Sequence, residues 1–256
     1  MKRFIFTAVI FVVGNFLYSQ SIYVEYLETK KISEDSKILL PKGMFAVSSK
    51  SFLYLLEYKN GESLYKNHPK SLNIKPYDTT YVENGIEVSE RLFYNQVEKI
   101  VYKNYAANEL RFTQPKGIDE IAYVKDKLID WNWKIEEETK MINKFLCKKA
   151  TAYVRGLHFT VWFTEDIPID CGPEYVNGLP GLIIYAENDF RRFEMNKIIF
   201  NADVKIEKPN FDNQRIYTMD ELYKTPSSST KNQNSETEVV QEGNTTITKK
   251  KIIIRN

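Results

Sequence analysis

The chain has 256 residues, of which 36 are basic and 34 acidic, and its formal net charge of +2 argues against a nucleic-acid-binding surface. Tyr, Phe and Trp make up 14% of the residues, and these types favour β-strands and amphipathic binding sites. The two histidines, His68 and His158, have no Cys or His at zinc-site spacing beside them. We therefore expect neither a metal site nor a cofactor.

The N-terminus has the pattern of a secretory signal peptide over residues 1–19. Lys2 and Arg3 precede an apolar run that ends at Leu17, and Ser19 offers a small residue for cleavage. The run is shorter than the ~20 apolar residues of a transmembrane helix. We therefore expect export to the periplasm or cell envelope, no transmembrane span, and a single β-rich domain over residues 20–225.

Short alternating runs separated by turn residues predict an antiparallel β meander. Asn60-Gly61 is a strong hairpin signal between two such runs, and Asn84-Gly85 is a second possible turn. The strand after Asp189 has one apolar and one polar face. A sheet with one apolar and one solvent-exposed face curls or is covered by other elements. The predicted fold class is mainly β (all-β or α+β), with the meander curled into a half-barrel-like sheet. The expected strands are at 22–27, 51–58, 97–102, 110–112, 131–135, 145–154, 157–164, 182–186 and 190–200.

The C-terminal part of the chain changes character. Thr218 and Glu221 have the spacing of a capping box, which predicts a short helix. Residues 226–256 form a polar, low-complexity tail that we expect to be disordered at its start. A hairpin at its end is possible, although two isolated strands are only marginally stable.

The stretch 167–183 contains three prolines and three glycines in an apolar surrounding, which predicts a rigid corner. Pro180 and Gly181 suit a type II turn with φ > 0 at Gly181. Gly172-Pro173 suits the start of a single helical turn over 174–176. We assign a structural role to Gly172, Pro173, Gly178, Leu179, Pro180, Gly181, Leu182 and Ile183.

The sequence from Trp133 to Ile183 resembles the GLPGLI family of secreted bacterial proteins. The complete hexapeptide from Gly178 to Ile183 carries the resemblance, and its upstream companions occur in the family's order. The resemblance implies export into the cell envelope and no established activity or catalytic residues. The chain departs from the usual pattern at 143–145 and 185–186. The companions are Glu138-Thr139-Lys140, Cys147-x-x-Ala150, Trp162-Phe163-Thr164, Ile167-Pro168-Ile169 and Gly172-Pro173.

The chain has two cysteines, Cys147 and Cys171. In an oxidising compartment an even number of cysteines predicts a single disulfide, which would tie a strand to the corner. The alternative is two buried thiols, since free cysteine packs as a small apolar residue.

Two functions from different classes remain open. The first is a non-enzymatic envelope protein whose curled sheet binds an apolar or lipid-like ligand or an envelope protein partner, with Trp133, Trp162 and Tyr175 as candidate binding aromatics. The second is an envelope hydrolase or modifying enzyme that uses carboxylates near Glu165, Asp166 and Asp170. Facing carboxylates in a polar cleft would favour the second function, and an aromatic pocket without them would favour the first.

Overall fold

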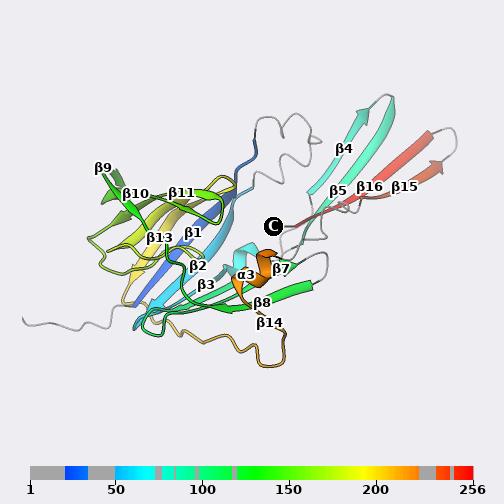
Figure 1. Ribbon diagram of the computed structural model, residues 1–256. Helices are drawn as coiled ribbons and strands as arrows, with labels where there is room; N and C mark the ends of the chain where they lie inside the picture. The colour runs from blue at the N-terminus through cyan, green and yellow to red at the C-terminus, as the bar shows by residue number, and fades with distance from the viewer. Residues whose placement is uncertain are drawn as a thin grey trace, which may run out of the picture.

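The computed structural model describes residues 21–33, 50–72, 77–83, 85–95, 98–116, 120–224, 235–242 and 245–255, which are mostly β-strand (Figure 1). The expected signal peptide and most of the expected disorder at the start of the tail lie outside these residues. Within them, no helix has the length and apolar character needed to cross a membrane.

A mixed sheet of 12 strands forms the body of the molecule. Its order is β14-β8-β7-β6-β3-β2-β1-β13-β12-β11-β10-β9, and all neighbours are antiparallel except β14 and β8. The strand β1 lies between β2 and β13, so the first strand joins an N-terminal and a C-terminal meander. The strands are β1 (Ser21–Lys30), β2 (Phe52–Lys59), β3 (Glu62–Asn67), β6 (Ile100–Asn104), β7 (Glu109–Lys116), β8 (Glu120–Asp126), β9 (Lys134–Ile142), β10 (Phe145–Val154), β11 (Leu157–Thr164), β12 (Leu182–Glu187), β13 (Arg191–Phe200) and β14 (Ile216–Tyr217).

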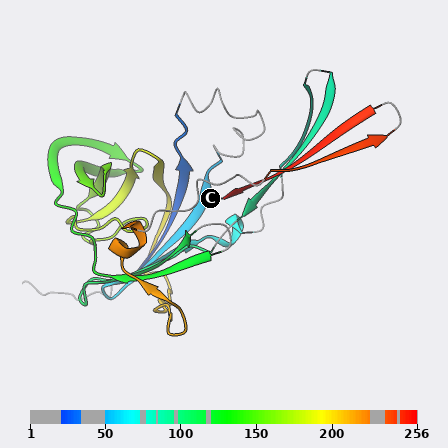
Figure 2. The same ribbon diagram turned by 45° about the vertical axis from the view of Figure 1, so that its right-hand side comes forward.

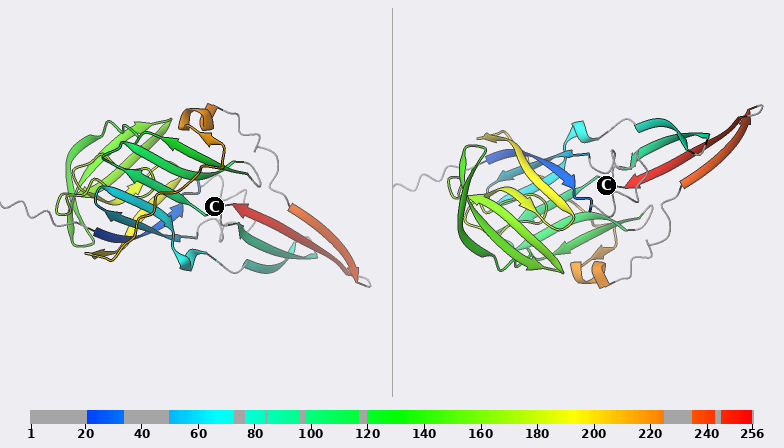
Figure 3. Two further views of the ribbon diagram at one scale, coloured as in Figure 1. Left: turned by 90° about the horizontal axis from the view of Figure 1, so that it is seen from below. Right: turned by 90° about the horizontal axis from the view of Figure 1, so that it is seen from above.

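This sheet curls strongly, and its outermost strands β14 and β9 are not paired with each other in the described residues (Figures 2 and 3). The core lies inside the curl. Val24 and Tyr26 of β1 alternate inward and are fully buried, as are Phe112 of β7 and Phe163 of β11. The predicted curled, mainly β fold is confirmed.

Local sequence patterns predicted a hairpin turn and a helix start correctly. Asn60 and Gly61 have φ of 53° and 77°, as a two-residue type I′ hairpin requires, and they join β2 to β3. The helix α3 (Met219–Lys224) has the predicted capping box: Thr218 Oγ1 accepts from the Glu221 N–H, and Glu221 Oε2 accepts from the Thr218 N–H. A short 3₁₀ turn, Pro69–Ser71, follows β3.

The strand predicted at 131–135 is wrong in position. Trp131 and Trp133 lie before β9, and Asn132 between them has φ of 47°, which breaks an extended strand. The strand instead covers Glu136, Glu137 and Glu138. These charged residues suit an edge strand because they discourage pairing with another sheet.

The polar excursion after β3 and the end of the tail form a second, four-stranded sheet that projects from the body (Figure 1). The hairpin of β4 (Tyr77–Glu83) and β5 (Ile86–Asn95) turns at Gly85, near the predicted position. The strands β15 (Ser235–Glu242) and β16 (Thr245–Arg255) form the second hairpin. Because β16 pairs parallel with β5, the terminal hairpin is not isolated, which corrects the sequence expectation.

Candidate functional site

The Pro/Gly corner connects β11 to β12 and is held by tight backbone turns. The Gly181 N–H donates to Leu179 O at 2.8 Å, a bond of the γ-turn type with Pro180 at its centre. Gly181 is not among the positive-φ residues, so the predicted type II turn is wrong. A Cβ at Gly181 would lie 2.0 Å from Thr164 O. Glycine is therefore required here by close backbone approach and not by a left-handed conformation.

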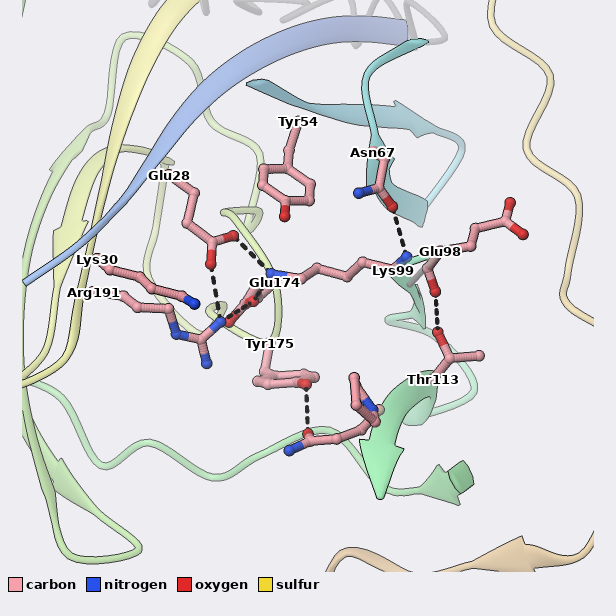
Figure 4. A pocket seen from close by; sticks show the side chains of 12 residues that line it. Glu28, Lys30, Tyr54, Asn67, Glu98, Lys99, Thr113, Glu174, Tyr175 and Arg191 are labelled. Carbon is pink, nitrogen blue, oxygen red and sulfur yellow. Dashed lines mark hydrogen bonds and ion pairs between the residues drawn. The ribbon is translucent and has the colours of Figure 1, made fainter. Parts of the chain in front are cut away.

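Glu174 occupies an unusual position within the corner. The Val176 N–H donates to Pro173 O at 3.0 Å and closes a turn, but Glu174 has φ of 46°, so the turn is not the predicted helical one. A left-handed conformation is uncommon for a residue other than Gly, Asn or Asp, and such strain concentrates at functional sites. The turn places the buried Glu174 carboxylate inside the curled sheet (Figure 4).

Three charged side chains, those of Lys99, Arg191 and Glu28, meet around this carboxylate (Figure 4). Lys99 Nζ donates to Glu174 Oε1 at 2.6 Å and to Glu28 Oε2 at 2.7 Å. Arg191 Nη1 donates to Glu174 Oε1 at 2.6 Å and to Glu28 Oε1 at 3.2 Å. Each carboxylate therefore contacts both cations, which compensates the cost of removing these charges from water.

The network shifts the pKa values of Glu174 and Lys99. Burial acts to raise the pKa of Glu174, but the charges of Arg191 and Lys99 outweigh it and hold that pKa below its ordinary value. Burial acts to lower the pKa of Lys99, and Glu174 and Glu28 reverse this effect and raise it. Glu174 and Lys99 are therefore held in their charged forms at neutral pH.

A cavity of about 230 Å³ opens beside this network on the inner face of the sheet. Tyr54 of β2 flanks Lys99, whose Nζ lies 4.5 Å from the centre of the tyrosine ring. The Tyr175 hydroxyl donates to Gln114 Oε1 at 3.4 Å. Most of the lining residues are of polar or charged type, although their carbon atoms supply more of the lining surface than their polar atoms do: Glu28, Lys30, Tyr54, Asn67, Glu98, Lys99, Thr113, Gln114, Pro115, Glu174, Tyr175 and Arg191.

A second buried cation supports the corner from β6. Lys103 is fully buried, and its Nζ donates to Gly172 O at 3.0 Å and to Val176 O at 2.9 Å. Burial lowers the pKa of Lys103. This lysine contributes no atom to the cavity lining, and its bonds to two corner carbonyls indicate a positioning role.

Of the three candidate binding aromatics, Tyr175 alone lines this cavity. Trp133 donates from Nε1 to Asn177 O at 2.7 Å and stacks on Trp131, so it fixes the outer part of the corner. Trp162 lies in β11, with Lys140 Nζ 3.8 Å from the centre of its ring.

The predicted disulfide is absent, and Cys147 and Cys171 are both buried free thiols. They lie in different surroundings. Cys147 Sγ donates to Phe145 O at 3.5 Å within β10, whereas Cys171 lies among Lys103, Tyr105 and Ser63. The alternative of two buried thiols is the arrangement that the structure shows.

The carboxylates named for the hydrolase do not lie at this cavity. Glu165 pairs with Lys148 at 2.7 Å, where both side chains are exposed. Asp170 Oδ1 accepts from the Gly178 N–H and so fixes the backbone of the motif. Glu28 and Glu174, two buried carboxylates that sequence reasoning did not select, line the cavity instead, and each is paired with Lys99 and Arg191.

Comparisons with known proteins extend this description only slightly. A family model described as "Protein of unknown function (Porph_ging)" matches residues 154–185, which run from the end of β10 through the corner to β12. No curated protein matches the chain. Two solved structures of PNGF-II, in the C2 and P21 space groups, align with TM-scores of 0.46 at 16% and 17% identity. The alignments cover 89% and 88% of this chain but 36% of each PNGF-II chain, and no functional statement about this chain follows from them.

A signal for two of the missed residues was present in the sequence. Val24, Tyr26 and Glu28 alternate along β1, and Met195, Phe193 and Arg191 alternate along β13. In each strand, extending the apolar face by two residues places a charged residue in the interior. No such local signal marks Lys99, which precedes β6 and is brought to the site by the order of the strands.

Proposed function

We propose that this chain is an exported, non-enzymatic protein of the cell envelope that binds a small polar ligand in the cavity of the curled sheet. One observation carries the proposal: a cavity lined mostly by residues with charged or polar groups lies where a β fold would otherwise bury apolar side chains. Replacing buried ion pairs with apolar residues is often neutral or stabilising. A polar interior is therefore better explained by a ligand than by stability alone.

The chemistry of the lining selects the kind of ligand. The cavity of about 230 Å³ is smaller than the ~300–1,000 Å³ typical of sites for drug-sized molecules. Its two aromatic members are already in ring contacts, Tyr54 with Tyr65 and Lys99 and Tyr175 with Phe112. The other lining residues supply mainly charges, amides and a hydroxyl. The charged and amide groups favour a small ligand that carries polar groups over the wholly apolar or lipid-like one suggested by the aromatic content of the sequence, and the carbon atoms of the lining, which supply more of its surface than the polar atoms do, can contact the rest of that ligand.

The hydrolase alternative receives less support from the same geometry. Acid–base hydrolysis by two carboxyl groups needs one of them protonated near neutral pH, which requires a raised pKa. The pKa of Glu174 is lowered, and its carboxylate is bound to Lys99 and Arg191. Binding without catalysis is therefore the function that this site supports best.

Native mass spectrometry of the folded protein tests the proposal after dialysis against a low-molecular-weight extract of bacterial envelopes. We expect a small molecule bound one to one. Gln114→Met removes an amide from the cavity while nearly preserving side-chain size, and should reduce the bound fraction. Gln214→Met, a change at an exposed position outside the lining, should leave it unchanged. Absence of a bound molecule, or equal loss in both variants, would contradict the proposal.

A further inference from the structure

The charged side chains that line the cavity balance one another. Three of them are basic and three are acidic: Lys30, Lys99, Arg191, Glu28, Glu98 and Glu174. Lys99 and Arg191 are each bonded to both buried carboxylates, and Lys30 also has an interaction partner. An ion that entered the cavity would lose its hydration without finding an unpaired charge of opposite sign, which is costly. The lining therefore favours a ligand without net charge.

The Tyr54 hydroxyl is a polar group of the lining that the protein itself does not use. Tyr54 is only 5% exposed, and its hydroxyl makes no hydrogen bond with any residue that the structure describes. The hydroxyl points towards the charged network (Figure 4). Burial raises the pKa of Tyr54 to about 12, so the group keeps its proton and can both donate and accept. Because a buried hydroxyl without a partner is unfavourable, this group favours a partner from outside the chain.

Further donor and acceptor atoms of the lining are left over from the bonds among the described residues. Glu174 uses Oε1 for the bonds from both of its cations, which leaves Oε2 as an acceptor. Asn67 and Gln114 each use the amide oxygen in a bond within the protein, which leaves both amide nitrogens as donors. The three residues belong to the corner, β3 and β7. The remaining polar atoms are therefore spread over separate elements and include both donors and acceptors.

We infer that the ligand of this cavity is an uncharged cyclic polyol of the monosaccharide class, whose hydroxyl groups bond to Tyr54, Asn67 and Glu174. The inference rests on the proposed binding function and adds the chemical class of the ligand. A hydroxyl group both donates and accepts, so a ring that carries several of them can meet donors and acceptors on separate elements. The C–H groups of the ring can contact the carbon atoms of the lining, and the small volume of about 230 Å³ favours a single ring.

Isothermal titration calorimetry with neutral sugars and their charged analogues tests the ligand class on the wild-type chain. The neutral probes are glucose, galactose and mannose, and each is compared with its 2-amino sugar and its uronate. We expect at least one sugar to bind at a single site, and both of its charged analogues to bind at least about tenfold more weakly because each adds an unpaired charge. Equal or tighter binding of a charged analogue would overturn the polyol inference while the binding function stands. If no sugar binds at millimolar concentration, the inference also fails, and native mass spectrometry decides the binding function separately.

A variant pair tests the position of the sugar. Tyr54→Phe removes the hydroxyl from the lining but keeps the ring that stacks on Tyr65, and it should weaken sugar binding about fivefold through the loss of one hydrogen bond. Tyr65→Phe is the matched control, because the Tyr65 hydroxyl is also buried and has no hydrogen-bond partner among the described residues, but it does not line the cavity. This change should leave sugar binding unchanged. Equal weakening by the two variants, or none by Tyr54→Phe, would overturn the assignment.

Discussion

Arg191 Nη1 donates to Glu174 Oε1 at 2.6 Å, and this ion pair attaches the Pro/Gly corner to β13. The two residues are 17 positions apart in the chain, and the second half of the corner and β12 lie between them. Lys99 and Glu28 complete the contact from the N-terminal meander. One charge network therefore joins both halves of the large sheet to the corner and forms a wall of the cavity.

Removing one member of this network should be costly. Arg191→Met leaves two buried carboxylates with Lys99 as their remaining partner, and we expect a loss of about 3 kcal/mol in the free energy of unfolding. This is the low end for breaking a buried pair, because a third of the Arg191 side chain is exposed. Urea denaturation provides the measurement.

Arg192→Met is the matched control for that change. Arg192 is the next residue on β13 and pairs with Glu194 at 3.4 Å on the surface, where both side chains are 44% exposed. Its replacement should cost less than about 1 kcal/mol. Similar losses in the two variants would show that the network does not stabilise the corner.

Acid should weaken the fold partly through Glu174. Because the pKa of Glu174 is lower in the folded chain than its ordinary value of 4.5, its ionised form contributes stability at pH values above 4.5. That contribution is lost as the pH falls through the folded pKa. Glu174→Gln should therefore reduce stability at pH 6, and the difference from wild type should shrink towards pH 2. A difference that stays constant over this range would refute a role for ionised Glu174.

Gly181 in the corner should be required for steric reasons. Gly181→Ala places a methyl group against Thr164 O, and we expect a destabilisation of about 3 kcal/mol, the upper range for overpacking. Gly156→Ala tests the other reason for glycine, since Gly156 has φ of 80° but a Cβ added there would have no atom within 4 Å. That change should cost about 1 kcal/mol. Thermal unfolding that ranked Gly156→Ala as the more damaging change would contradict this account.

The cysteines should react only slowly in the folded chain. Both thiols are buried, and burial raises the pKa of Cys147 to about 11 and also raises that of Cys171. A thiol reagent should therefore modify two groups per chain rapidly after unfolding without reductant, and neither of them rapidly before it. Failure to detect free thiols in the unfolded, unreduced chain would instead support a disulfide.

Local patterns in the sequence were sufficient for much of the large sheet. Asn60-Gly61 fixed one hairpin, and the alternation from Leu157 to Thr164 gave β11 with its observed bounds. The pattern failed at β9, where Glu, Thr and Lys fill an edge strand that buries little surface. It also failed for the second sheet, because parallel pairing of β16 with β5 joins segments about 160 residues apart.

The site itself was predicted only in part. The motif that contains Glu174 was recognised as the organising corner, and Tyr175 was selected as a binding aromatic. Glu28 and Arg191 are 163 positions apart and meet because β1 pairs with β13. No local property of the sequence specifies that pairing. Long-range strand order therefore determines the site, whereas short-range patterns determine its parts.

The central claim is that a small polar ligand occupies the cavity beside Glu174 and Arg191. Two-dimensional ¹H–¹⁵N NMR of the folded chain, titrated with the low-molecular-weight fraction of a bacterial envelope extract, tests this directly. The account predicts saturable shifts in the amides of Lys30, Lys99, Gln114 and Tyr175, and none in those of the outer edge strand β9. Shifts centred on another surface, or no shifts at any concentration, would contradict it.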